Sequence, residues 1–538
     1  MRSVACAVAL LTSGAAAQTR TVEILNADLV TVEADSGGVV RRLDGNVRLR
    51  QDTTLLSSRS AVYDESRSEV VLRGGVRIVS GRDTLTAEEV VYRSDTRVAE
   101  ARTQVRVGDG ESALYAPQAT YDARAEVSTF SGGGRILHRG SVLTSPAGTY
   151  SSATRVARMS GPVRLVDSTG VLTAARGTYD ARVERADFAG AVRLRRPDTR
   201  LAADSVVYFR RTERARAYGR VALERIGSER GGREAPADSS RRTFLFGEQL
   251  LYDGPAGTAQ ARGETRPGRT PRDPLLVSLQ GQPDGGVDTT LVRAPRLDAL
   301  RTVAGADTTQ TLVAWGGARV WDGRLAAVAD SARIVRSAPR DGPAVDRLGL
   351  FGATRPSAWA DGAQLTGDTL FVSSRARPDG AERVDTLLVV GQAFSARVDS
   401  TVGRVQQLAG GRMLAVFDST DAAALRRLSV WPTAEALTFR AEAGRLAGAD
   451  RLSADSLAIV FERGAIREVR GYGGIAGTAY GPRIVPEGVR LPGFAFAPEA
   501  APTRAAVFDS AGWEAEWLAS FGPPPEALQP PETPGDGP

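Results

Sequence analysis

The sequence predicts an all-β protein made of repeated, stacked strands, and three observations support this fold class. First, six tyrosines recur at a spacing of 29 residues. Second, a leucine stands seven residues before each of these tyrosines. Third, short segments such as Gly45–Leu49 alternate apolar and polar residues, as a half-buried strand does. A fixed period between 20 and 50 residues is typical of an array whose units bury their apolar faces against their neighbours.

The periodic positions form four columns along the first half of the chain. The tyrosine column is Tyr63, Tyr92, Tyr121, Tyr150, Tyr179 and Tyr208. The leucine column is Leu56, Leu85, Leu114, Leu143, Leu172 and Leu201. A glycine column, in which Thr103 is the exception, is Gly45, Gly74, Gly132, Gly161, Gly190 and Gly219. An aliphatic column four residues after the glycines is Leu49, Ile78, Val107, Ile136, Leu165, Leu194 and Leu223.

Each unit contains two strand patterns. The first is Gly-x-Val-x-Leu, as in Gly161–Leu165, with valine and leucine on one face. The second is Leu-x-small followed by the tyrosine and a turn former, as in Leu172–Asp180. No part of the repeat region shows a sustained helical period.

The repeats continue in a less regular form beyond Tyr208. Tyr252 follows 44 residues later, and Leu245 again lies seven residues before it, so we place an insertion at residues 226–242. The pattern Leu201–Ser205 recurs as Leu365–Thr369 and Leu452–Ser456. We therefore expect a repeat domain at 18–262, a linker at 263–290 and a second, degenerate domain of the same kind at 291–490.

The two ends of the chain differ from the repeats. Residues 1–17 have the charge, apolar run and Ala-x-Ala site of a secretory signal peptide, with cleavage expected after Ala17. Residues 491–538 hold 10 of the 28 prolines, which predicts an extended or disordered tail. No run of about 18 apolar residues follows the leader, so no transmembrane helix is expected. The only cysteine, Cys6, lies within the leader.

Composition argues against a nucleic-acid partner. All 69 basic residues are arginines, but the net charge is only +6 over 538 residues. Basic segments such as 210–216 mix both charge signs, and no nucleic-acid-binding motif accompanies them. We expect no nucleic-acid partner.

The sequence offers little for catalysis. The one histidine, His138, lies at an ordinary repeat position and is expected to be an exposed polar residue. A metal site would need further histidine or cysteine ligands, and the expected mature chain has no second histidine and no cysteine. The recurrent Asp204, Asp368 and Asp455 fit solvent-facing residues at strand edges better than calcium ligands. We expect no enzyme, no metal and no cofactor.

These repeats resemble a known family. The exported chain, with its Gly-x-Val-x-Leu and Leu-x-Ala-Asp-x-x-x-Tyr strands, is similar to the OstA-like domain of the LptA family, which also forms the N-terminal part of an outer-membrane partner protein. The similarity is densest over residues 40–255 and extends with gaps to about residue 480.

The resemblance implies a fold, an activity and a location. The fold would be a V-shaped β-jellyroll (β-taco) of stacked antiparallel strands, either one or two in tandem. The activity would be to shelter lipopolysaccharide acyl chains in an apolar groove during periplasmic transport, with an association with the outer membrane as a further expectation. Partners would be lipopolysaccharide or a related glycolipid, the inner- and outer-membrane transport proteins joined by edge-strand addition, and further copies of the chain head to tail.

The inward aliphatic columns are the expected groove lining. They are Val47, Leu49, Leu56, Val76, Ile78, Leu85, Val105, Val107, Leu114, Ile136, Leu143, Val163, Leu165, Leu172, Val192, Leu194, Leu201, Val221 and Leu223. The tyrosines lie an odd number of residues from the leucines, so on an unbroken strand they would face away from the groove. The exposed edges are expected at residues 22–32 and 471–484.

Two other functions remain open from the sequence. One is a secreted structural or adhesive β-repeat protein with a closed, dry core. The other is a polysaccharide-cleaving β-helix enzyme, although no cluster of carboxylates is found in register. Uniform aliphatic columns favour the groove over the closed core.

Overall fold

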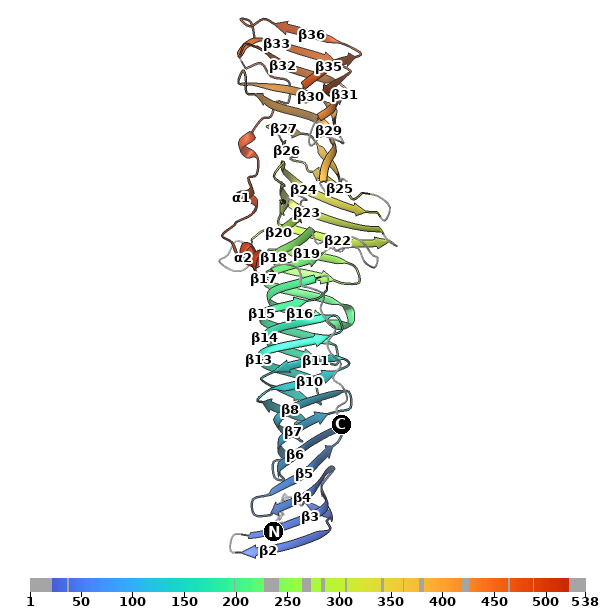
Figure 1. Ribbon diagram of the computed structural model, residues 1–538, viewed down its shortest axis with the longest axis vertical. Helices are drawn as coiled ribbons and strands as arrows, with labels where there is room; N and C mark the ends of the chain where they lie inside the picture. The colour runs from blue at the N-terminus through green and yellow to red at the C-terminus, as the bar shows by residue number, and fades with distance from the viewer. Residues whose placement is uncertain are drawn as a thin grey trace, which may run out of the picture. The chain divides into compact units, whose positions relative to one another are not determined.

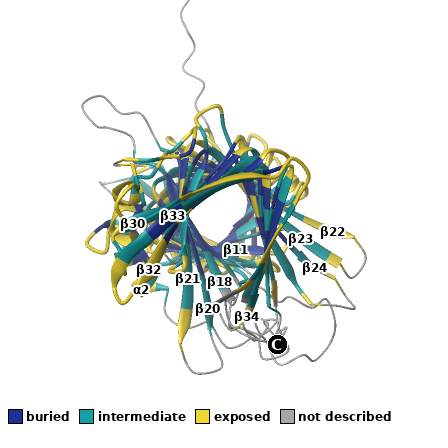
Figure 2. Ribbon diagram, turned by 90° about the horizontal axis from the view of Figure 1, so that it is seen from above, coloured by how far each residue is buried: buried dark blue, intermediate teal, exposed yellow. Residues whose placement is uncertain are grey.

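A computed structural model describes residues 22–35, 38–197, 199–226, 241–263, 272–281, 286–304, 307–339, 343–360, 362–376, 382–418, 425–462, 465–486 and 488–521. The chain divides into two compact units, and the division falls within one strand. Unit 1 comprises Met1–Ser168 and Ala175–Arg182, and unit 2 comprises Thr169–Ala174 and Val183–Pro538. Figure 2 shows that buried residues lie along the strands, whereas exposed residues gather mainly at the turns.

Unit 1 consists of antiparallel strands that follow one another in chain order (Figure 1). They are β1 (Glu23–Asn26), β2 (Leu29–Asp35), β3 (Gly38–Gln51), β4 (Thr54–Asp64), β5 (Glu69–Ser80), β6 (Asp83–Arg93), β7 (Val98–Gly108), β8 (Ser112–Asp122), β9 (Val127–Ser131), β10 (Gly134–His138), β11 (Ser141–Ser145), β12 (Ala147–Ser151) and β13 (Val156–Asp167). β14 (Gly170–Asp180) contains the division between the units. The prediction of stacked antiparallel strands is confirmed.

Each long strand of unit 1 has two halves separated by a bulge. β4 pairs with β5 through residues 60–64 and again through residues 55–57, with a register shift between Ser57 and Ser60. Shifts at the equivalent place interrupt the pairs β3–β4, β5–β6, β6–β7 and β7–β8. We call the halves that carry Leu49 and Leu56 the leucine arm, and the halves that carry Tyr63 and Tyr92 the tyrosine arm.

The glycine column marks these bulges. Gly45, Gly74 and Gly161 have φ angles of 73°, 81° and 82°, in the left-handed region that favours glycine. Thr103, the exception in the column, adopts the same conformation with a φ of 64°. The periodic glycine is therefore a requirement of the bend.

The recurrent aspartates are also explained by the bends. A methyl group at Gly391 would lie 2.0 Å from Asp368 Oδ2, and one at Gly219 would lie 2.3 Å from Asp204 Oδ2. The backbone N–H of Asp368 donates to the carbonyls of Val390 and Gly391 at 3.0 and 2.9 Å. These aspartates are exposed and sit against the bulge of the neighbouring strand, which is a structural role.

Unit 2 continues with the same two-armed strand pairing. Its strands are β15 (Arg185–Arg195), β16 (Thr199–Phe209), β17 (Arg214–Ile226), β18 (Arg241–Asp253), β19 (Thr258–Arg262), β20 (Leu275–Gly281), β21 (Val287–Arg293), β22 (Arg296–Ala304), β23 (Asp307–Trp321), β24 (Leu325–Ala338), β25 (Val345–Phe351), β26 (Ser357–Ala360), β27 (Ala363–Thr366), β28 (Thr369–Ala376), β29 (Glu382–Asp399), β30 (Arg404–Phe417), β31 (Leu425–Trp431), β32 (Ala434–Glu442), β33 (Arg445–Ala454), β34 (Ser456–Glu462), β35 (Ala465–Tyr472) and β36 (Ala476–Tyr480). The helical segments are η1 (Arg210–Thr212), η2 (Pro498–Ala500), α1 (Arg504–Val507) and α2 (Trp513–Ser520).

The prediction of a linker at 263–290 is wrong for the residues of this range that form strands β20 and β21. β20 pairs with β18 and β21, and β21 begins at Val287. Leu275, Leu276 and Val277 are all buried, because both faces of this strand are covered. A strand buried on both faces loses the apolar–polar alternation by which strands were recognised in the repeats.

The predicted disordered tail is also wrong as far as residue 521. Val507, Phe508 and Trp517 are buried against Phe244, Phe246 and neighbouring residues on the outer face of the leucine arm in unit 2. Further back, Leu491, Phe494 and other residues of 485–496 pack on Phe394, Leu437 and Phe439. We call residues 485–521 the C-terminal strap.

Charged residues also fasten the strap. Glu514 is 1% exposed, and its Oε1 lies 2.9 Å from Arg272 Nε and 3.4 Å from an Arg293 guanidinium nitrogen. Arg293 Nε also donates to the Val507 carbonyl at 2.6 Å. Removing one partner of a buried ion pair leaves a desolvated charge, so this network holds the strap in one register.

Several predicted segments lie outside the described residues. These are the signal peptide at 1–17, residues 227–240 of the insertion, and residues 522–538 of the tail. Within the described ranges, no helix is long and apolar enough to span a membrane.

Trp517→Ala is expected to lower the free energy of unfolding of unit 2 by about 3 kcal/mol, because it removes a buried indole from the strap. Trp517 is 7% exposed and lies under the Arg193 guanidinium, 3.8 Å from the ring centroid. The measurement is urea unfolding followed by tryptophan fluorescence, which reports on unit 2 alone because all six tryptophans lie at or after residue 315.

Glu516→Ala, on the exposed side of the same helix, is the matched control and should change stability little. Equal stability of the two variants would contradict the packing of the strap.

Candidate functional site

The predicted aliphatic columns form a cross-strand ladder along the leucine arm. In unit 1, Leu49 pairs with Leu56, Leu56 with Ile78, and Ile78 with Leu85. The ladder continues through Val107, Leu114, Ile136, Leu143 and Leu165. In unit 2 it runs through Leu194, Leu201, Leu223, Leu245, Leu276, Val292 and Val320. Within each unit, successive residues of the ladder are direct cross-strand partners.

Most of the predicted lining residues are buried. In unit 1, Val47, Leu49, Leu56, Val76, Ile78, Leu85, Val105, Val107, Leu114, Ile136, Leu143, Val163 and Leu165 are each 7% exposed or less. In unit 2, Leu172, Val192, Leu201 and Val221 are also buried. Leu194 and Leu223 are half-buried, and each lines a cavity.

The tyrosine arm carries a second set of interior residues that the sequence prediction missed. Leu43, Leu72, Ala101, Phe130, Met159 and Phe188 are each 4% exposed or less. They keep the same 29-residue step, so the signal was present in the sequence. It was overlooked because these positions mix leucine, alanine, phenylalanine and methionine.

The tyrosines face the interior, contrary to the prediction from an unbroken strand. Tyr92, Tyr121 and Tyr150 are 1, 2 and 3% exposed. In β4 the buried positions are Leu56 and Ser58 before the bend and Ala61 and Tyr63 after it. The alternation therefore changes phase at the register shift, and the leucine and the tyrosine face the same side.

Tyrosine hydroxyls join the outer ends of the two arms in unit 1. Tyr92 donates to Gln51 Oε1 at 2.6 Å. Tyr121 donates to Asp83 Oδ2 at 2.8 Å, and Tyr150 to Asp109 Oδ2 at 3.0 Å. We call this line of contacts the tyrosine seam. It closes the side of unit 1 that lies opposite the bends.

Burial and hydrogen bonding shift the titration of the seam. Burial raises the pKa of Tyr92 to about 12. Burial, followed by the Asp83 carboxylate, raises the pKa of Tyr121. Burial would raise the pKa of Asp109, but N–H donation from Ser112 and Glu111 and the Tyr150 hydroxyl hold that pKa below its usual value. The phenols are therefore protonated donors and Asp109 is an ionised acceptor at neutral pH.

His138 belongs to the seam and is not the exposed residue that was expected. It is 2% exposed, its Nδ1 lies 2.9 Å from the Ser112 hydroxyl, and its ring packs edge-on against Tyr179. Ser112 is itself only 4% exposed, so a substrate in solvent does not reach the pair. The histidine bridges β8 and β10 inside the fold.

A cavity opens between the two arms of unit 2, where the tyrosine column ends. Tyr252 pairs with Ala259, and Ala259 pairs with Ala299. Tyrosines alternate with small residues such as Ala99 and Ala215 on successive strands, so Ala259 continues this alternation and Ala299 stands where the next phenol would be expected. The cavity has a volume of about 150 Å³. Its floor combines Leu223, Leu245 and Leu276 of the leucine arm with Ala259, Ala299, Leu312 and Ile334 of the other arm.

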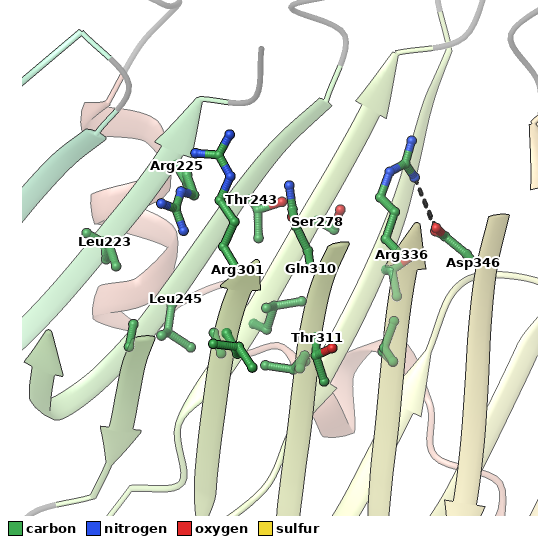
Figure 3. A pocket seen from close by; sticks show the side chains of 17 residues that line it. Leu223, Arg225, Thr243, Leu245, Ser278, Arg301, Gln310, Thr311, Arg336 and Asp346 are labelled. Atoms are coloured by element: carbon green, nitrogen blue, oxygen red, sulfur yellow. Dashed lines mark hydrogen bonds and ion pairs between the residues drawn. The ribbon is translucent and has the colours of Figure 1, made fainter. Parts of the chain in front are cut away.

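Polar and cationic side chains form the rim of this cavity (Figure 3). One strand row places Arg301, Gln310, Arg336 and Asp346 beside one another. The facing row is Arg225, Thr243, Ser278 and Thr290. Arg336 pairs with Asp346 at 3.2 Å. The site therefore offers an apolar floor below a cationic rim, which suits an amphiphile with a negative charge.

No group of metal-ligating side chains is present in the described part of the chain. The cavity lining contains neither histidine nor cysteine, and its single carboxylate is bound to Arg336.

The comparisons support the family resemblance over part of the chain. Residues 19–175 match the family model described as OstA-like protein. The resemblance read from the repeats is thus confirmed for this segment, which contains most of unit 1.

The solved structures that match include the periplasmic protein LptH from Pseudomonas aeruginosa. Its title describes it as the LptA homologous component of the conserved lipopolysaccharide transport device. The identity is 12%, the match covers 26% of this chain and 82% of LptH, and the TM-score is 0.14. The comparison with curated proteins gave no match.

The tyrosine seam should make the protein sensitive to alkaline pH. Tyrosine in an unfolded chain titrates near pH 10. Because the folded-state pKa of Tyr92 is raised to about 12, its contribution to stability is complete below pH 10 and is lost as pH rises from 10 towards 12.

Thermal unfolding between pH 9 and 11.5 measures this dependence. Tyr92→Phe removes the titrating group, so its stability should fall with pH less steeply than that of the wild type, by at most about 1.4 kcal/mol per pH unit. Identical slopes for both proteins would show that Tyr92 does not titrate with folding.

Proposed function

We propose that this chain is a periplasmic carrier that shelters the acyl chains of lipopolysaccharide, or of a related glycolipid, during transport towards the outer membrane. The observation that carries the proposal is the aliphatic ladder within each unit. The OstA-like match over residues 19–175 supports the class of protein.

The ladder has the chemistry that an acyl chain needs. Neighbouring strands lie about 4.8 Å apart, so successive aliphatic pairs give a closely spaced apolar lining. Burying an acyl chain is favourable by about 0.8 kcal/mol per methylene. A lining without directional polar contacts holds the chain equally well at successive strands, which permits sliding.

Passage through unit 1 would require the tyrosine seam to part. The interior columns there are packed, and the Tyr92, Tyr121 and Tyr150 hydroxyls bridge the arms. A hydrogen bond contributes only about 1 kcal/mol net. The free energy gained by burying several methylenes of an acyl chain could therefore offset the cost of breaking a few seam hydrogen bonds.

The location and partners follow from the same proposal. Export with cleavage after Ala17 would bring the mature chain to the periplasm. Among the described residues, β1 and β2 each pair with β3 alone, β35 pairs with β34 alone, and β36 pairs with β33 alone. Such edges would take up strands from inner- and outer-membrane transport proteins, or from another copy.

A second candidate function is a secreted structural β-repeat protein with a closed core. The specific observation that favours it is the almost complete burial of the interior of unit 1 together with its seam. A structural role would need no lipid, so the two functions differ in whether lipid is found inside.

A photo-crosslinking amino acid at Leu223 should capture lipid in the producing cells, because this half-buried residue lines the cavity of unit 2. The same amino acid at Arg216, an exposed position on the same strand, should capture none. Mass spectrometry of the adducts identifies the lipid. Absence of lipid at Leu223, together with lipid-free protein in native mass spectrometry, would favour the structural role.

Ile24→Pro should abolish association through the N-terminal edge, because proline removes a ladder donor. Ile24 lies in the edge strand β1 and is 39% exposed. Ile24→Ala keeps the N–H and is the matched control. Light scattering with size-exclusion chromatography measures self-association. Association of the proline variant that equals that of the alanine variant would exclude this strand as the contact.

A further inference from the structure

We propose that the cavity between the arms of unit 2 is an anchoring site for the negatively charged head of an acylated lipid, with the phosphate at the arginine rim and an acyl chain on the leucine floor. This inference rests on the proposed function for the identity of the cargo. It adds a fixed position at which the cargo is held.

The layering of the cavity fits an amphiphile. On the leucine arm, the floor residue Leu245 and the rim residue Thr243 are two positions apart on β18, so both point into the cavity. On the facing arm, Leu312 and Gln310 have the same relation on β23. Apolar and polar layers therefore lie at matching depths on both arms.

The rim carries an excess of positive charge. Arg225, Arg301 and Arg336 are three guanidinium groups, and Asp346 is the one carboxylate among the lining residues. Arg336 pairs with Asp346 at 3.2 Å. Arg301 Nε is buried without a hydrogen-bond partner among the described residues. A planar guanidinium suits the oxygens of a phosphate, which would accept from that donor.

Neutral donors complete the rim. Thr243, Ser278 and Thr290 form a row on neighbouring strands opposite Gln310. Hydroxyl and amide groups donate to phosphate oxygens without adding charge. The set combines strong cationic contacts with weaker neutral ones.

The tyrosine seam explains why such a site occurs here and not in unit 1. In unit 1 the equivalent depth is filled by phenols such as Tyr121, bonded to acids such as Asp83. Acids at the mouth would repel a phosphate, and the phenols fill the space. Beyond Tyr252 both features are lost, and arginines stand at the rim.

Binding of three simple probes to the purified full chain tests the site. Isothermal titration calorimetry is run with dodecyl phosphate, dodecanol and inorganic phosphate, the alkyl probes below their micellar concentrations. Dodecyl phosphate should bind at least tenfold more tightly than dodecanol, because a hydrogen bond to a charged group is worth about a tenfold change in affinity or more. Inorganic phosphate should bind much more weakly than dodecyl phosphate, because it gains nothing from the floor.

Arg301→Gln should remove most of the preference for dodecyl phosphate over dodecanol. Arg347→Gln is the matched control, since Arg347 is exposed on β25 next to Asp346 and outside the cavity lining. Circular dichroism melting establishes that the variants fold. If Arg301→Gln does not fold, Arg225→Gln provides the same comparison from the facing arm.

Three outcomes would overturn the inference. The first is no binding of dodecyl phosphate, or equal affinity for dodecanol. The second is inorganic phosphate binding as tightly as dodecyl phosphate, which would indicate a site for a free anion. The third is an unchanged preference in the folded rim variant.

The test separates this inference from the proposed function. Binding of dodecyl phosphate that depends on Arg301, in a protein that captures no lipid in cells at Leu223, would leave the anchoring site standing and reject the carrier. Lipid capture at Leu223 with no preference for the phosphate probe would retain the carrier and reject the anchoring site.

Discussion

The long strands bend at a register shift between neighbours, and the interior of the protein depends on this bend. The bulge reverses the alternation of side chains, so the leucine of one arm and the tyrosine of the other both point inward. Positive φ angles at Gly45, Gly74 and Gly161 make the bend sterically accessible. Without this change of phase, either the leucine or the tyrosine column would face solvent.

The seam of unit 1 and the cavity of unit 2 differ in the residues that lie at the outer ends of the strands. Strands bent in this way bring their outer ends towards each other, and the residues at those ends decide whether the interior is closed. In unit 1, the phenols of Tyr121 and Tyr150 donate to acids, and that of Tyr92 donates to the Gln51 amide oxygen. In unit 2, Ala299 stands in place of the next phenol and arginines stand at the rim, so space and positive charge remain. Chemistry at the ends of the strands therefore varies while the aliphatic ladder is retained.

The C-terminal strap adds a covering layer that unit 1 does not share among the described residues. Strands β18 and β20 carry apolar residues on both faces, and the strap buries their outer face, together with Leu291 of β21, with Phe508 and Trp517. Glu514, held by Arg272 and Arg293, fixes the strap beside the wall that supplies Leu245 and Leu276 to the cavity. Alternate residues of the same strand contact the strap on the outer face and line the cavity on the inner face. Packing of the strap therefore helps to position the residues that line the cavity.

The sequence by itself determined the all-β class, the 29-residue repeat and the aliphatic ladder. These are properties of local period, and a 29-residue step places equivalent side chains on successive strands wherever the stack lies in space. The burial of the tyrosines depended on a bulge. A repeat period gives the spacing between equivalent residues of successive repeats, but it does not show which face a side chain takes after a bend within one repeat. The role of residues 485–521, the strands within 263–290 and the arginine rim were decided by tertiary structure. They arise from contacts between segments far apart in the chain, such as Arg293 with Glu514, and no local pattern encodes such partners.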